Sequence, residues 1–251
     1  DRRSRHEGPV GGISDHLHDR YYHRHNKRLV LGLSMFSNPT FIAFTGVDSA
    51  DCLPGLMDLG RHYPIEWGVL VDDDKVDDIL FANPDVRARL LETPGLLCAA
   101  HVCGEQARLI ANSPQDVTVD LSRFQRAQVN HSFSGSSAEQ IENTVRFGRM
   151  KRVRTMLQCL VDFPADCRLD WLYDTSFGTG KSPDRWPALP GAQGPLCGYS
   201  GGIRAENVRD ILSDIAAPVG SQYFIDMESG VRTDGRFDLG KCEAVCKAVF
   251  G

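Results

Sequence analysis

Three polar segments in the last third of the sequence combine residue types that could bind an anion or move a proton. Two of them, residues 199–202 (YSGG) and 226–230 (DMESG), place glycine and serine where an apolar run ends. Paired glycines let backbone N–H groups approach an anion closely, and the positive end of a following helix adds to the attraction. Each turn alone could be an ordinary tight turn, but two together favour a phosphate site. The residues predicted to bind phosphate are Gly201, Gly202, Ser229 and Gly230.

The third segment, residues 173–181 (YDTSFGTGK), places a carboxylate after another apolar run and follows it with a glycine-rich loop. Asp174 would point from a strand end into a site where burial raises the pKa of a carboxyl group, so that it can act as a general acid. The loop is not a P-loop, because the GxxxxGK spacing is missing. A solvent-exposed loop with a capping aspartate is the alternative. The loop residues expected near a substrate are Gly178, Thr179, Gly180 and Lys181.

Two residues of the run LLCAAHVC (96–103) are further candidates for proton transfer. The imidazole of His101 titrates near neutral pH, which suits a general base, although a lone histidine at a strand end is more often structural. Cys103 could act as a nucleophile or base only if the pKa of its thiol were lowered.

A regular series of apolar runs must position these residues. Runs such as IEWGVLV and LLCAAHVC are almost continuously apolar, which is typical of parallel strands covered on both faces. Helical patterns alternate with them, and eight such units favour a closed (β/α)8 TIM barrel of the α/β class over an open sheet. In such a barrel the site lies at the carboxyl ends of the strands. The predicted strands are residues 41–47, 65–71, 96–103, 124–131, 154–161, 170–175, 196–200 and 223–227.

Helical segments fit between most of these strands. Ser137 and Gln140 have the spacing of a capping box, and Asp238 is a candidate N-cap of the last helix. Only DFPADCRL separates the fifth and sixth strands, so we expect a shortened fifth helical connection there. The predicted helices are residues 49–61, 104–111, 136–150, 204–215 and 238–249.

Several motifs resemble those of the phosphoribosylanthranilate isomerase family. DTSFGTGK followed by SPDRW resembles the stretch in which that family's catalytic aspartate precedes a GGTGK loop. YSGGIRAENVRDIL resembles its AGGL-TPENV motif, and DMESGVRTDGRFDLGKCEAV resembles its D-x-SSGVE segment. FTGVDSAD resembles its opening KICGLT motif, and AQVNHS its fourth-strand QLHG motif. The resemblance covers residues 41–250 in order, and the last third carries most of it.

This resemblance implies a general acid at Asp174, substrate contacts from Gln128 and Asn130, and phosphate binding by the two glycine turns. It also implies an intramolecular aldose-ketose isomerase of tryptophan biosynthesis. One departure is decisive for the chemistry, because Thr45 occupies the position of the family's base cysteine. A threonine hydroxyl is too weak an acid to supply a resting base. The family's arginine after the second strand is also absent, and only Lys75 stands there among acids.

The hypotheses that follow share a phosphorylated small-molecule ligand. The first is an isomerase-like enzyme, with Thr45, His101 and Asp174 at its catalytic centre and altered chemistry. The second is a different phosphosugar lyase or epimerase, in which His131 joins His101 and Asp174. The third is a non-catalytic protein that binds a phosphometabolite.

Composition limits the other functional classes. The chain has 251 residues, of which 41% are hydrophobic and 24% charged, and a formal net charge of -5, which argues against a nucleic-acid-binding protein. No run approaches the roughly 20 apolar residues that span a bilayer. Scattered cysteines predict reduced thiols in a cytoplasmic protein. The pair Cys242 and Cys246 lacks a second pair of zinc ligands nearby, so we expect neither metal nor organic cofactor.

The N-terminal segment differs from the rest in composition. Residues 1–35 are rich in histidine and arginine and lack the apolar core of a signal peptide. We therefore predict two parts, an extension over residues 1–35 and a barrel over residues 36–251. The sequence leaves the oligomeric state open.

Overall fold

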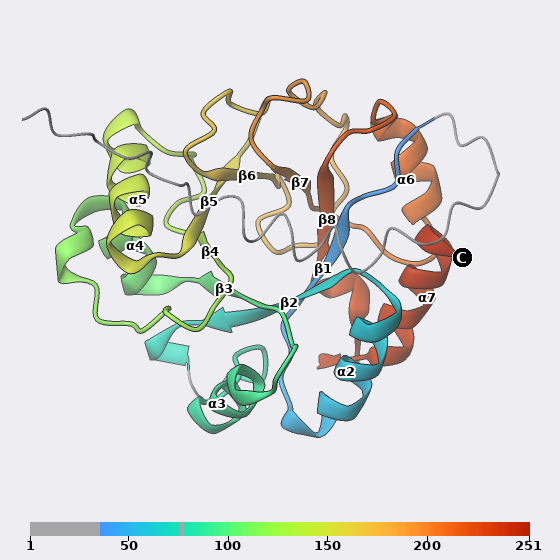
Figure 1. The fold of residues 1–251 in the computed structure, drawn as a ribbon, viewed down its shortest axis with the longest axis horizontal. Helices are drawn as coiled ribbons and strands as arrows, with labels where there is room; N and C mark the ends of the chain where they lie inside the picture. Colours follow the sequence, from blue (N-terminus) through green and yellow to red (C-terminus); the bar gives the residue numbers. More distant parts are fainter. Residues whose placement is uncertain (1–35, 76–77) are drawn as a thin grey trace, which may run out of the picture. The chain divides into compact units, whose positions relative to one another are not determined.

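A computed structural model describes residues 36–75 and 78–251, in which eight parallel strands close into a barrel (Figure 1). Each strand pairs with the next, and the last pairs with the first. The predicted extension over residues 1–35 lies outside the described residues. The strands are β1 (Phe41–Thr45), β2 (Ile65–Val71), β3 (Cys98–Val102), β4 (Arg126–Val129), β5 (Arg154–Cys159), β6 (Asp170–Tyr173), β7 (Cys197–Tyr199) and β8 (Tyr223–Met227).

The predicted TIM barrel is therefore confirmed, and so are all eight predicted strands. Six of them are shorter than predicted, because residues at their carboxyl ends leave the sheet and form loops. Those loops surround the mouth of the barrel.

Six α-helices accompany the strands among the described residues. The sequence predicted most of them, including the capping box of Ser137 and Gln140 and the cap at Asp238, whose side chain accepts from two backbone N–H groups. It missed α3 (Pro84–Glu92), whose N-cap Asn83 accepts a hydrogen bond from Val86 N. No helix of residues 36–75 or 78–251 has the length and apolarity needed to cross a membrane. The helices are α2 (Leu53–His62), α3 (Pro84–Glu92), α4 (Gly104–Asn112), α5 (Ala138–Lys151), α6 (Val208–Ile215) and α7 (Leu239–Phe250).

Short elements complete the chain. Four are 3-10 helices and two form a small antiparallel hairpin after β8. They are η1 (Ala50–Cys52), η2 (Asp73–Lys75), η3 (Pro114–Asp116), η4 (Ser229–Val231), β9 (Arg232–Thr233) and β10 (Arg236–Phe237).

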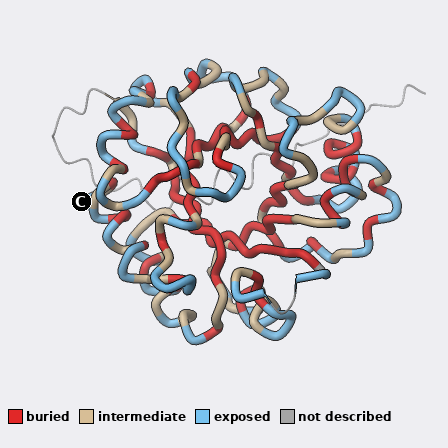
Figure 2. The backbone as a smooth tube through the Cα atoms, turned by 180° about the vertical axis from the view of Figure 1, so that it is seen from behind, coloured by how far each residue is buried: buried red, intermediate tan, exposed pale blue. Residues whose placement is uncertain are grey.

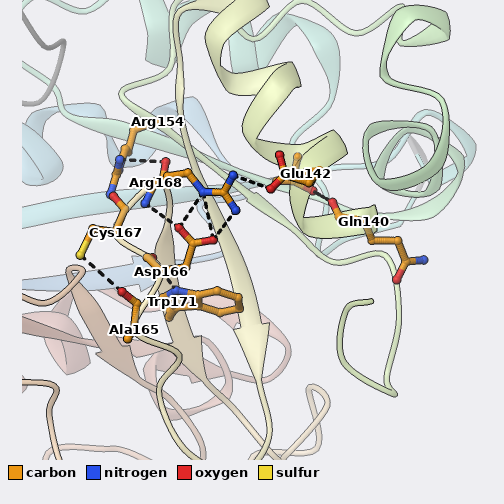
Figure 3. A network of polar contacts seen from close by, with 9 residues as sticks. Gln140, Glu142, Arg154, Ala165, Asp166, Cys167, Arg168 and Trp171 are labelled. Carbon is orange, nitrogen blue, oxygen red and sulfur yellow. Dashed lines mark hydrogen bonds and ion pairs between the residues drawn. The ribbon is translucent and has the colours of Figure 1, made fainter. Parts of the chain in front are cut away.

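No helix connects β5 to β6, as the short DFPADCRL segment predicted, and none connects β6 to β7 either. Side-chain hydrogen bonds hold the first of these connections (Figure 3). Arg168 pairs with Asp166 at 2.7 Å and with Glu142 of α5. Trp171 Nε1 donates to Asp166 O at 3.1 Å. These contacts tie the loop to its neighbours in place of a packed helix.

Alternate residues of each strand face the helices or the inside of the barrel. The helix-facing set, which includes Phe44 and Trp67, packs with the helices into one apolar core. Figure 2 shows buried residues gathered along the strands, with exposed residues on the surrounding loops and helices. The inward-facing set is much more polar, and its members Glu66, Arg126 and Asp170 are almost completely buried.

These three residues form an ion layer inside the barrel. Arg126 pairs with Glu66, and its Nη1 lies 3.6 Å from Asp170 Oδ2. The guanidinium carbon lies 4.3 Å from the ring centroid of Phe224 and 5.2 Å from that of Phe41. The two carboxylates and the two aromatic rings thus compensate the desolvation of the buried Arg126 guanidinium.

We predict that Arg126→Met lowers the free energy of unfolding by about 3–5 kcal/mol, because the buried carboxylate of Glu66 would lose its cation, whereas Asp170 would keep Arg154 at 2.7 Å. Urea unfolding followed by circular dichroism at pH 7 measures this. Arg123→Met is the matched control: Arg123 lies on the surface, 3.7 Å from Glu92, and its replacement should change stability by less than about 0.5 kcal/mol. Equal losses in the two variants would contradict the prediction.

Candidate functional site

A cavity of about 580 Å³ opens at the carboxyl ends of the strands. Every strand, or the residue directly after it, contributes a side chain to the cavity wall. Most of these side chains are polar, which differs from the apolar filling usual inside a barrel. One lining residue from each strand, in order, is Thr45, Leu70, His101, Gln128, Gln158, Asp174, Ser200 and Asp226.

Thr45 joins two titratable residues in the cavity. Its hydroxyl donates to Asp226 Oδ1 at 2.7 Å, and its Oγ1 lies 3.3 Å from His101 Nε2. Gly68 of β2 makes this approach possible, since a Cβ atom there would lie 2.9 Å from His101 Nε2 and collide with the Thr45 hydroxyl. Ser200 Oγ donates to the other oxygen of Asp226 at 3.4 Å. Both carboxylate oxygens therefore have a hydroxyl partner.

Burial shifts the two titratable groups in opposite directions. It raises the pKa of Asp226 to about 7, opposed by the Thr45 hydrogen bond and assisted by the negative charges of Asp174 and Glu228. It lowers the pKa of His101 to about 3, with a further contribution from the positive charge of Arg126. At neutral pH His101 is uncharged, whereas Asp226 is poised to take up or release a proton.

Asp174 follows β6 and faces the same cavity. Its Oδ1 accepts a hydrogen bond from Ser176 N at 2.8 Å, and Gln158 Nε2 donates to its carbonyl oxygen at 2.7 Å. The side chain is thus oriented by its own loop. Within the described residues its second carboxylate oxygen has no hydrogen-bond donor.

The candidates from β3 and β4 form a second polar group on the wall. Gln128 Nε2 donates to Asn130 Oδ1 at 2.8 Å, and Asn130 Nδ2 lies 3.5 Å from Cys103 Sγ. Burial raises the pKa of Cys103, so it is a neutral thiol rather than a nucleophilic thiolate at pH 7. His131 also lines the cavity, and its Nε2 lies 2.8 Å from Ser136 Oγ.

The two glycine turns lie together at the cavity wall. Gly201 and Gly202 adopt positive φ angles of 113° and 65°, which glycine tolerates best. Both residues are buried and line the cavity, as does Ser229. Backbone N–H groups inside proteins almost always have a partner, so unpaired ones here mark a place for an acceptor. The N–H groups that donate to no described residue are those of Gly201, Gly202, Ile203, Ser229 and Gly230.

The loop after β6 packs onto these turns. Gly178 and Gly180 line the cavity. A Cβ atom on Gly180 would collide with the Ser229 hydroxyl, and one on Gly202 would lie 2.7 Å from Ser182 N. The glycines therefore let three loops approach one another around the same space.

Three predicted residues lie at the margin of the site. Thr179 and Lys181 are not among the residues that line the cavity, and Lys181 is exposed. Gly230 lines a neighbouring cavity of about 390 Å³ together with Arg204 and Lys241.

Sequence reasoning assigned no role to several residues that the fold brings into the cavity: Asp72, Gln158, Ser200, Asp226 and Glu228. The sequence did contain a pattern that indicates Asp226 and Glu228. Alternate residues of a strand face the same side, so these two should point into the barrel together with Phe224 of β8. Asp226 is also the first residue of the D-x-SSGVE resemblance, but only the strand phase indicates that both side chains point inward.

Comparison with solved structures finds the same fold in three phosphoribosylanthranilate isomerases. Monomers of the dimeric Thermotoga maritima protein align with TM-score 0.55 and 16% identity over 84% of this chain and 98% of that one. The Pyrococcus furiosus protein aligns with TM-score 0.53 and 14% identity, over 83% of this chain and 98% of that one. The Thermococcus kodakaraensis protein aligns with TM-score 0.50 and 16% identity, over 84% of this chain and 99% of that one. Such low identities show the fold alone. No protein-family model and no curated protein sequence matches this chain.

The shifted pKa of Asp226 predicts a specific pH dependence. Its folded value of about 7 exceeds its ordinary 3.8, so the folded protein retains the proton between these values, and this contribution to stability is lost as pH rises from about 4 to about 7. The free energy of unfolding of the wild type should fall over this range relative to Asp226→Asn, by roughly 3–4 kcal/mol at most. Urea unfolding at pH 4 to 8 measures the difference.

The control for this measurement is Asp214→Asn, an exposed position on α6. Its stability difference from the wild type should stay nearly constant with pH. If the Asp226→Asn difference were equally flat, Asp226 would titrate normally and could not serve as a proton acceptor near pH 7.

Proposed function

We propose that this protein binds a phosphorylated sugar in the barrel mouth and transfers protons on the sugar, in the manner of an aldose-ketose isomerase. The observation that carries the proposal is the group of unpaired N–H donors at the two glycine turns, directly beside the cluster of Thr45, His101 and Asp226. An anion site and a proton-transfer site thus share one cavity.

The phosphate would occupy the glycine turns. Gly201, Gly202 and Ser229 offer N–H groups to phosphate oxygens, and the Ser229 hydroxyl is a further donor. Holding the phosphate would keep the sugar carbons at a constant position relative to Asp226, which is how remote binding energy favours a reaction. Asp174 lies on the same cavity wall and could reach the sugar from another strand.

In the proposed chemistry, Asp174 protonates the ring oxygen while the bond between C1 and this oxygen breaks, and the lone pair of the C1 oxygen or nitrogen forms the C=O or C=N cation. The carboxylate of Asp226 then removes the proton from C2, and the released electron pair neutralises the cation to give an enol or enamine. This intermediate tautomerises to the ketose when C1 gains a proton and the C2 hydroxyl loses one. Asp226 suits this step because its pKa of about 7 lies near the working pH. Thr45 orients the carboxylate through its 2.7 Å hydrogen bond and is a positioning residue.

Asp226 would thus act as the general base that Thr45, at the position of the family's cysteine, cannot provide. The family resemblance puts the base on the first strand, where this chain has Thr45, and the 2.7 Å hydrogen bond points from there to Asp226 on the last strand. The names of the similar structures, phosphoribosylanthranilate isomerases, support the same reaction class. His101 stays neutral and completes the hydrogen-bonded group.

We predict that Gly202→Ala weakens the binding of ribose 5-phosphate about tenfold or more, because its Cβ would lie 2.7 Å from Ser182 N and distort the turn. Isothermal titration measures the Kd. Gly95→Ala is a matched control: Gly95 has φ +82° and nothing within 4 Å of the added Cβ, so backbone strain changes while the cavity does not. Equal weakening in both variants, or equal affinity for ribose without its phosphate, would refute the phosphate site.

We also predict that the wild type catalyses exchange of the C2 proton of ribose 5-phosphate with solvent deuterium. Asp226→Asn should reduce this rate by about 10²-fold or more, because the proton acceptor is lost. Thr45→Val should reduce it less, and Asp214→Asn should leave it unchanged. Proton NMR in D₂O measures the exchange. Phosphate-dependent binding without any exchange would favour the non-catalytic hypothesis.

A further inference from the structure

The Thr45 hydroxyl lies between two groups that can each hold a proton. It donates to Asp226 Oδ1 at 2.7 Å, and its oxygen lies 3.3 Å from His101 Nε2. A hydroxyl carries a single hydrogen, so an oxygen that gives this hydrogen to Asp226 can only accept from His101. When Asp226 is a carboxylate, His101 Nε2 therefore carries the ring hydrogen, and Nδ1 of the neutral ring is bare.

Protonation of Asp226 reverses both of these hydrogen bonds. A protonated carboxyl group becomes a donor, and two hydroxyl oxygens lie near it, Thr45 Oγ1 at 2.7 Å and Ser200 Oγ at 3.4 Å. The shorter contact has the usual length of an O–H···O hydrogen bond, whereas the longer one exceeds it, so the proton favours Oδ1. Thr45 then turns its own hydrogen towards His101 Nε2, and the ring must carry its hydrogen on Nδ1.

The surroundings place this rearrangement in the neutral pH range. Burial raises the pKa of Asp226 to about 7 and lowers that of His101 to about 3. The ring therefore stays neutral where Asp226 titrates, and only the position of its hydrogen changes. The other charged groups that act on the Asp226 carboxyl are two that raise its pKa, Asp174 and Glu228, and one that lowers it, Arg126.

Both ends of this chain of hydrogen bonds face the cavity. Asp226 lines it from β8 and His101 from β3. Within residues 36–75 and 78–251, His101 Nδ1 has no hydrogen-bond partner, so an atom of the ligand can bind there. A proton taken up at one end can thus be matched by a proton released at the other.

From this geometry we propose that Thr45 relays protons between Asp226 and His101, and that His101 accepts the hydroxyl proton which the sugar loses in the last step of the isomerisation. The inference rests on the proposed function and deepens it, because the enol or enamine must gain a proton at C1 while its C2 hydroxyl loses one. Thr45 acts through its two neighbours rather than on the sugar.

Every proton in this step has a donor and an acceptor. Asp226 returns the proton that its Oδ2 took from C2 to C1, where the C1=C2 electron pair forms the new C–H bond. The C2 hydroxyl gives its proton to His101 Nδ1, and the released electron pair forms the C2=O bond. His101 passes its Nε2 hydrogen to Thr45, and Thr45 passes its own hydrogen to Asp226 Oδ1.

The relay leaves no net charge in the buried cluster, where an uncompensated charge would be costly. After the step Asp226 is protonated on Oδ1 and His101 on Nδ1. The relay then runs backwards, so that Asp226 becomes a carboxylate and His101 Nδ1 releases one proton to water. Asp174 regains from water the proton that it gave to the ring oxygen, which completes the cycle.

The tautomer of His101 tests the relay without any ligand. Proton–nitrogen correlation NMR of the full chain with isotope-labelled histidine shows which ring nitrogen carries the hydrogen, and His101→Gln assigns the signal. Between pH 8.5 and 5.5 we expect the hydrogen to move from Nε2 to Nδ1, with a change in the tautomer ratio of at least about tenfold centred near pH 7. In Thr45→Val the ratio should stay constant, whereas Thr45→Ser, which keeps the hydroxyl, should retain the change.

His131 is an internal control in the same spectrum. It lines the same cavity, but its Nε2 lies 2.8 Å from Ser136 Oγ, and no described hydrogen bond joins it to Asp226. Its tautomer should not follow the titration of Asp226. Asp226→Asn should hold His101 in one tautomer at every pH. A wild-type His101 tautomer that does not respond when Asp226 titrates would overturn the relay.

Two rates measured on ribose 5-phosphate test the catalytic role. Exchange of the C2 proton in D₂O needs Asp226 alone, whereas formation of ribulose 5-phosphate needs the whole relay. Thr45→Val and, separately, His101→Gln should lower ketose formation about tenfold more than exchange. The double variant should show no further loss, because both substitutions interrupt one path. If Thr45 only oriented Asp226, both rates would fall together, and the inference would be wrong.

Thr155→Val is the matched control. Thr155 is also buried and its hydroxyl donates to Thr144 O at 3.4 Å, but it does not line the cavity. It should keep the wild-type ratio of the two rates. A wild type with neither exchange nor ketose formation would refute the proposed function, and the catalytic step with it. The His101 tautomer would still decide whether Thr45 couples the two groups, so the two failures are distinguishable.

Discussion

The structure depends on a constraint that a closed parallel barrel imposes on every inward-facing residue. Eight strands place alternate side chains in one narrow space from which water is excluded, so each polar group there needs a partner. Arg126 meets this requirement at the base of the barrel, between Glu66, Asp170 and two aromatic rings. The ion layer allows a barrel with polar contents to remain closed, and the site is built from the same inward-facing residues nearer the mouth.

The chemistry of the site follows from that burial. Asp226 and His101 lie above the ion layer, where the loss of hydration favours the neutral form of each. The carboxyl group becomes a proton acceptor suited to neutral pH, and the imidazole becomes an uncharged hydrogen-bonding group. Thr45 connects the two, which gives a role to a residue that cannot itself act as a base.

The loops at the mouth show the same dependence on close packing. The connection after β6 has no helix, yet it packs onto both glycine turns because Gly180 and Gly202 have no side chains to keep the loops apart. Within the described residues, the N–H groups of Gly201, Gly202 and Ser229 remain without acceptors. A phosphate group would supply the acceptors that these N–H groups lack.

The sequence by itself determined the barrel, because continuous apolar runs alternating with amphipathic segments are local patterns that survive into the fold. It also indicated the glycine turns, Asp174 and the missing helix between β5 and β6. It could not identify Asp226 as the acidic partner of Thr45, since they are 181 residues apart and meet only where β8 pairs with β1. It could not assign protonation states either. Burial and neighbouring charges set the pKa of His101 and of Asp226, and both arise only when the closed barrel brings distant strands together.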